Sequence, residues 1–149
     1  MLNQKRLKYS KVMSRRDAGI LPFVLHHQPQ KVYLHSADDV YNYCKSMMSY
    51  PKEIFRVLLL NDQRKLIYDE IVAIGTLNGC RIFIREVFRM AVFINAAGII
   101  VVHNHPSGDP APSREDIRLA KLLKESSNIM GIPILDNVVI GDGGFELVG

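Results

Sequence analysis

Residues 98–117 read GIIVVHNHPSGDPAPSREDI and predict a strand, a loop and the start of a helix. Residues 99–102 are all β-branched, which predicts a central strand in a sheet that is covered on both sides. Residues 104–112 are rich in proline and glycine and predict a loop that folds the chain back. The predicted strand therefore ends on two histidines, His103 and His105, where it enters this loop.

A helix is expected to follow the loop. Ser113 is a residue type that favours the N-cap, and the acids after it suit the first turn of a helix. We expect this helix to run to about Met130, with Gly131 ending it. Its expected buried face is formed by Ile117, Ala120, Leu122 and Leu123.

The remaining residues predict an α/β fold class around this strand–loop–helix unit. Hydrophobic periodicity predicts helices over 36–49 and 85–95, and strands over 53–60, 65–75, 132–140 and 145–148. The first two of these strands form a hairpin, and residues 75–79 carry a further turn signal. The order α-β-β-α-β-α-β-β indicates a mixed sheet with helices on its faces.

The composition is typical of one globular domain that follows a basic arm. The chain has 149 residues and a formal net charge of +4. The positive charge is concentrated in Lys5, Arg6, Lys8, Lys11, Arg15 and Arg16. We therefore expect a basic N-terminal extension over residues 1–33 and a domain over residues 34–149. Such an arm is typical of solvated tails as well as of segments that bind nucleic acid.

The sequence carries no signal for a membrane or for secretion. No apolar run reaches the roughly 18 to 20 residues that a membrane-spanning helix needs, and no signal-peptide pattern is present. The expected location is the cytoplasm, with no membrane partner. Cys44 and Cys80 lack CxxC spacing, so we expect free thiols rather than a disulfide.

The two histidines at the end of the predicted strand suggest a metal site. Side chains at positions i and i+2 of a strand project to one face, so His103 and His105 can bind one cation. A third ligand is needed, and Asp116 is the natural candidate because the loop returns the chain toward it. Asp109 is a second candidate, although its Gly-Asp-Pro setting favours a turn. Ser113 and Asp116 also fit a capping box, which would give Asp116 a structural role.

The spacing of these residues resembles a known family. His103-Asn-His105, seven further residues, Ser113, two residues and Asp116 match the HxH-x7-S-x2-D signature of JAMM (JAB/MPN+) metalloproteases. The wider sequence resembles the RadC-like JAB domain over about residues 34–149. Its quoted motifs are SADDV, EIFRVLLLN, GTLN, REVF, NAAGIIVVHNHPSGDPAPSREDI and GIPILDNVVIG. The resemblance implies a JAB/MPN, cytidine-deaminase-like architecture.

The resemblance also implies a set of site residues. His103, His105 and Asp116 would bind Zn2+, and Ser113 would stabilise the oxyanion of a tetrahedral intermediate. Glu53 would hydrogen-bond the zinc-bound water and act as general acid and base. Among glutamates, the residues alone do not distinguish Glu53 from two rivals, Glu70 and Glu86.

The leading functional hypothesis is a zinc-dependent metallopeptidase-type hydrolase that cleaves a peptide or isopeptide-like amide in a peptide or protein substrate. The alternative is a non-enzymatic accessory protein in DNA repair or recombination, with DNA bound by residues 5–16. A metal-free interaction domain is a third hypothesis, and the intact ligand pattern argues against it. A homodimer also stays open, because the strand at Arg56–Leu60 or the N-terminal arm could pair with a second chain.

Overall fold

The computed structural model describes residues 31–75 and 81–149. The basic arm, the turn signal at residues 76–79 and Cys80 lie outside the described residues. Within the described residues, no helix has both the length and the apolar character needed to cross a membrane.

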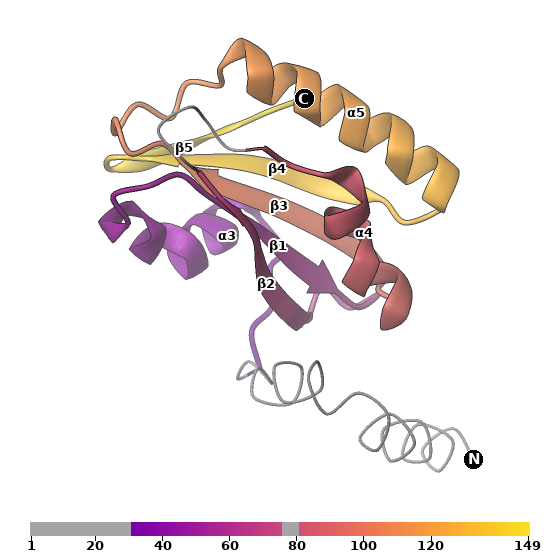
Figure 1. Cartoon of the computed structure of the whole chain (residues 1–149). Helices are drawn as coiled ribbons and strands as arrows, with labels where there is room; N and C mark the ends of the chain where they lie inside the picture. The colour runs from indigo at the N-terminus through magenta and orange to yellow at the C-terminus, as the bar shows by residue number, and fades with distance from the viewer. Residues whose placement is uncertain (1–30, 76–80) are drawn as a thin grey trace, which may run out of the picture. The chain divides into compact units, whose positions relative to one another are not determined.

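A five-stranded mixed sheet forms the centre of the fold, in the order β2-β1-β3-β4-β5 (Figure 1). The strands are β1 (Ile54–Leu60), β2 (Leu66–Ile74), β3 (Gly98–Asn104), β4 (Ile134–Gly141) and β5 (Gly144–Leu147). β3 and β4 run parallel, whereas the other neighbouring pairs are antiparallel. The predicted α/β class, the mixed sheet and the hairpin of the first two strands are confirmed, and β3 is the central strand.

Helices cover the sheet on both sides, and Figure 1 shows α3 and α5 on opposite sides of it. The helices are α3 (Ala37–Cys44), α4 (Ile84–Phe93) and α5 (Arg114–Met130). The predicted helix over 36–49 begins as expected, but its last part tightens into a 3-10 helix, η1 (Lys45–Ser49). α5 begins after Ser113 and ends at Gly131, whose φ of 68° is the left-handed conformation that favours glycine.

Apolar side chains at alternate positions of the strands form the core beneath α3. Val40 and Cys44 of α3 pack in one cluster with strand residues that include Leu58, Ile100 and Val138. Burial raises the pKa of the Cys44 thiol to about 12. Cys44 is free, as predicted, and is a packing residue of this core.

The predicted buried face of α5 is wrong at two positions. Ile117 is 57% exposed and Leu122 is 48% exposed. The buried residues of α5 are instead Asp116, Leu123 and Ser127. At 3.6 residues per turn these three share one line along the helix, and Ile117 and Leu122 lie roughly 100° or more to either side of it. The helix is therefore oriented so that the polar side chain of Asp116 faces the sheet, which a purely apolar pattern does not reveal.

This orientation predicts different costs for truncating two adjacent leucines. Leu123→Ala should lower the free energy of unfolding by about 2–5 kcal/mol, because it leaves a cavity in a closely packed site. Leu122→Ala should change that free energy by no more than about 0.5 kcal/mol, because the side chain is half in solvent. Urea denaturation of the two variants measures both values. Equal losses would contradict the observed orientation of α5.

One expected route to a homodimer is excluded by the topology. β1, which contains Arg56–Leu60, lies between β2 and β3 and hydrogen-bonds to both. It therefore has no free edge that could accept a strand from a second chain. The edges of the described sheet are β2 and β5.

Candidate metal centre

The two histidines of the motif lie where the central strand ends. β3 stays extended through Asn104, so His103 and His105 project from the same side of it. Their ring centroids are 5.1 Å apart. His103 is 1% exposed, and its ring stacks on Phe55 of β1 with centroids 5.8 Å apart. The strand therefore presents two imidazoles from a rigid, buried position.

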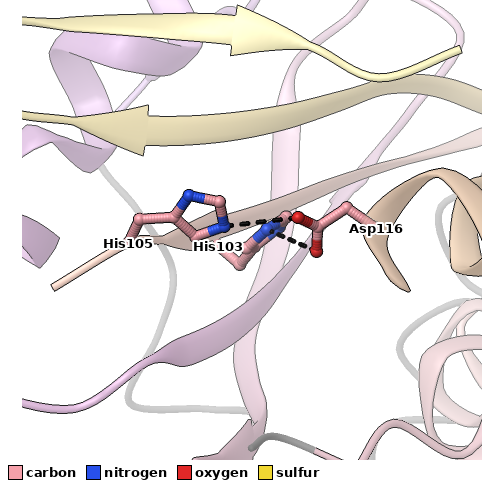
Figure 2. Close-up of side chains that lie close together, drawn as sticks. All are labelled: His103, His105 and Asp116. Atoms are coloured by element: carbon pink, nitrogen blue, oxygen red, sulfur yellow. Dashed lines mark ion pairs between the residues drawn. The ribbon is translucent and has the colours of Figure 1, made fainter. Parts of the chain in front are cut away.

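Asp116 meets both histidines from the first turn of α5, as Figure 2 shows. Its Oδ1 lies 3.0 Å from Nε2 of His103, and its Oδ2 lies 3.3 Å from Nε2 of His105. One ligand atom from each of the three residues falls within 4.8 Å of the others. The structure thus brings together the three residues of the predicted ligand set, from a strand end and a helix start.

Asp116 also completes a capping box at the start of α5. Its Oδ2 accepts a 2.7 Å hydrogen bond from the Ser113 N–H, and its own N–H donates to Ser113 Oγ at 3.1 Å. Burial by itself would raise the pKa of Asp116, but the contacts with His103 and Ser113 outweigh burial and lower that pKa. The carboxylate is therefore anionic at neutral pH, as a metal ligand must be.

The hydrogen bonding of the histidines fits a cation at this place. His103 Nε2 lies 3.0 Å from Asp116 Oδ1, and His103 Nδ1 is buried without a hydrogen-bond partner. Buried polar atoms are seldom left in this state, and a metal would use the lone pair of Nε2. His105 Nδ1 lies 2.8 Å from the backbone oxygen of Asp109, so an Nδ1–H donated there leaves Nε2 free to bind. Two imidazole nitrogens and one carboxylate oxygen suit zinc.

Asp109, the second candidate for the third ligand, is placed elsewhere. Its Oδ1 accepts a 2.9 Å hydrogen bond from the Ala111 N–H, which is a turn interaction of its own loop. The carboxylate of Asp109 is not part of the three-residue cluster. Asp109 instead contributes through its backbone oxygen, which orients the ring of His105.

The loop between the histidines and Asp116 is held against the turn that joins β4 and β5. The carbonyl of Gly108 accepts a 2.6 Å hydrogen bond from the Asp142 N–H. A Cβ added at Gly141 would lie 2.5 Å from that same carbonyl and 2.5 Å from Pro110 Cδ, so only glycine fits there. The close approach at Gly141 positions the loop, and sequence patterns did not reveal it.

Glu53 lies just before β1, close to the cluster. Phe55 pairs with His103, so the two-residue period of a strand places Glu53 on the same face as that histidine. Glu53 is half-buried, and this burial raises its pKa; the carboxylate of Asp116 adds to the rise, whereas His103 and His105 oppose it. These charges are the electrostatic neighbours expected of a carboxylate beside the cluster.

The two rival glutamates have other partners. Glu70 pairs with Arg89 of α4 at 2.6 Å, and Glu86 pairs with the same arginine at 3.4 Å. Ser113 is exposed, and its Oγ accepts the helix-cap hydrogen bond described above. A hydroxyl also has a proton to donate, so the cap does not exhaust its hydrogen-bonding capacity.

Comparison with known proteins assigns the chain to a family. A family model described as the RadC-like JAB domain matches residues 34–147. The chain belongs to this family. The match contains every member of the cluster as well as Glu53 and Ser113, and it confirms the resemblance seen in the sequence.

Relatives of this RadC-like JAB domain include proteins from several organisms. A UPF0758 protein of Caldanaerobacter subterraneus subsp. tengcongensis is 47% identical over 121 residues, which are 80% of this chain and 52% of that protein. A UPF0758 protein of Thermotoga maritima is 38% identical over 123 residues, which are 81% of this chain and 55% of that protein. The chain thus spans about half the length of the curated relatives that it matches.

Asn104 is a functional candidate that the sequence pattern did not reveal, because there it is only the residue between the two histidines. It is fully buried, and its side-chain amide hydrogen-bonds the backbone next to Glu53. The two-residue period of a strand could have revealed it. A polar residue between two ligands of a buried strand must face the opposite side of the sheet, and an amide buried there without a hydrogen-bond partner is costly. Residues 103–105 of this RadC-like JAB domain therefore carry three polar side chains with defined partners or neighbours.

Proposed function

We propose that this protein is a zinc-dependent hydrolase of the JAMM type that cleaves a peptide or isopeptide-like amide. The observation that carries the proposal is the convergence of His103, His105 and Asp116, with ligand atoms within 4.8 Å of one another. The Nε2 atoms of His103 and His105 both face the Asp116 carboxylate, at 3.0 and 3.3 Å, which is the arrangement expected of three ligands around one cation.

The proposed roles of the side chains are those that the family resemblance implies, and their positions support them. His103 Nε2, His105 Nε2 and one Asp116 oxygen would hold the zinc and leave a fourth position open. Zinc held there would lower the pKa of a bound water to about 7 and would itself polarise a substrate carbonyl. The proton transfers and the contact with the oxyanion are assigned to side chains of the protein.

Glu53 is assigned the proton transfers. Its raised pKa suits a group that takes a proton from the attacking water and returns it to the leaving nitrogen. Ser113, which accepts the cap hydrogen bond through Oγ, is assigned the donation of its O–H to the oxyanion that forms on the former carbonyl. Both assignments rest on the proposed zinc chemistry.

Metal analysis tests the proposal. Protein stripped with a chelator, reconstituted with zinc at neutral pH and desalted is expected to retain about one zinc per chain. The zinc-loaded protein is then incubated with mixed linear and isopeptide-linked peptides in oxygen-labelled water, and mass spectrometry detects label in each new carboxylate. Protein that retains no zinc would overturn the metal centre, and zinc without labelled product would refute the hydrolase.

A further inference from the structure

Asn104 fixes both peptide groups that flank Glu53. The Ile54 N–H donates a 2.7 Å hydrogen bond to Asn104 Oδ1, and Asn104 Nδ2 donates a 3.2 Å bond to the carbonyl of Lys52. These two groups belong to the peptide units immediately before and after Glu53. Asn104 is 0% exposed, so no water competes for its amide.

A side chain is needed here because the backbone ladder ends. β1 and β3 pair up to Phe55 and His103. Beyond that pair the β1–β3 register ends, whereas the pairing with β4 continues: the His105 N–H donates to the carbonyl of Ile140 at 2.9 Å. The Ile54 N–H, which is next in line on β1, donates to the side-chain oxygen of Asn104, so this amide takes the place of the missing ladder partner.

The backbone of Glu53 is also held by Gly75, which directly follows β2. The carbonyl of Glu53 accepts a 2.7 Å hydrogen bond from the Gly75 N–H. The backbone of Glu53 is thus held from two directions, by Gly75 on one side and by Asn104 on the other. Of these two anchors, only Asn104 also lies between the two histidines of the cluster.

We infer that Asn104 is a positioning residue for Glu53, and this inference rests on the proposed hydrolase function. One strand end presents His103 and His105 on one face and, from the opposite face, holds the segment that carries the proton-transfer group. Residues 103–105 then set where the two histidine ligands lie relative to the carboxylate of Glu53. Catalytic groups need placement to within about 0.5 Å, and a buried bidentate amide is suited to give it.

The test uses the full chain and two variants at Asn104. Asn104→Leu keeps the branching of the side chain and removes both hydrogen bonds, whereas Asn104→Asp keeps the acceptor for Ile54 and, while ionised, loses the donor to Lys52. Asn137→Leu is the matched control, because Asn137 is also buried in the sheet, on β4, and its Oδ1 has no partner. Circular dichroism and urea denaturation establish that each variant folds.

The specific readout is the pH midpoint at which the visible absorption of the cobalt-loaded protein changes. Glu53→Gln is expected to shift this midpoint, because it removes a charge beside the metal. Asn104→Leu should shift it in the same direction, and Asn137→Leu should leave it unchanged. Asn104→Asp should shift it in the opposite direction, because it keeps the bond to Ile54 and adds a charge beside the metal. In the Glu53→Gln background, Asn104→Leu should add no further shift, since the two residues act as one unit. All variants should bind one equivalent of metal, as the unaltered protein does.

Each outcome separates this inference from the proposed function. If the unaltered protein binds neither zinc nor cobalt, or if Glu53→Gln leaves the midpoint unchanged, the proposed function fails and takes this inference with it. If Glu53→Gln shifts the midpoint and Asn104→Leu does not, the role of Asn104 alone is overturned. An equal shift from Asn104→Leu with and without Glu53 would also overturn it, because the effect would then be a general structural one.

Discussion

Asp116→Ala is expected to abolish stoichiometric zinc binding. The substitution removes the only carboxylate of the described cluster and leaves two imidazoles, which cannot hold zinc tightly. Loss of a group that merely orients a ligand already weakens metal affinity by roughly 10–100-fold, so loss of the ligand itself should exceed about 100-fold. Competition with a chromogenic chelator at neutral pH measures the change.

The same substitution also breaks the capping box of α5, so a control must separate the two effects. α3 offers one, because Ser36 and Asp39 form the same reciprocal pair of hydrogen bonds at its N-terminus. Asp39→Ala should weaken a helix cap without changing zinc affinity. Asp116→Asn should retain an acceptor for the Ser113 N–H and still lose zinc. Tight zinc binding by Asp116→Ala, or equal loss of zinc from both alanine variants, would contradict the ligand role.

Glu53→Gln is expected to lower the rate of amide hydrolysis by roughly 10²–10⁴-fold while zinc binding is retained. Glutamine has nearly the same shape but cannot accept and return a proton, so only the proton transfers are lost. Glu53 lies outside the three-residue cluster, which is why affinity for zinc should be preserved. The measurement is the rate of product formation from a peptide that the zinc-loaded, unaltered protein cleaves.

Glu70→Gln supplies the matched control for that experiment. Glu70 is paired with Arg89 at 2.6 Å and belongs to β2, so its removal takes away one ion pair without changing the charge beside the cluster. Its rate should stay close to that of the unaltered protein. If Glu70→Gln proves as slow as Glu53→Gln, or if Glu53→Gln keeps full activity, the assignment of the proton transfers is wrong.

Local patterns predicted the elements of the fold because each rests on interactions between near neighbours. The β-branched run at residues 99–102 predicted the central strand, and Ser113 and Gly131 marked the ends of α5 within a residue. The spacing of His103 and His105 predicted a shared face. The orientation of α5 was not predictable in this way, because a buried carboxylate, rather than an apolar stripe, faces the sheet.

The sequence by itself determined the family, the order of helices and strands, and the residue types of the candidate ligand set. These follow from hydrophobic period, caps and motif spacing, which act over a few residues along the chain. The family resemblance named Glu53, but the residues alone did not separate it from Glu70 and Glu86. The tertiary structure brings Glu53 beside that set, pairs the other two glutamates with Arg89, and holds the Glu53 backbone through Asn104. The reason is that residues 53 and 104 become neighbours through the antiparallel pairing of β1 and β3, and strand register sets this contact across 50 intervening positions of sequence.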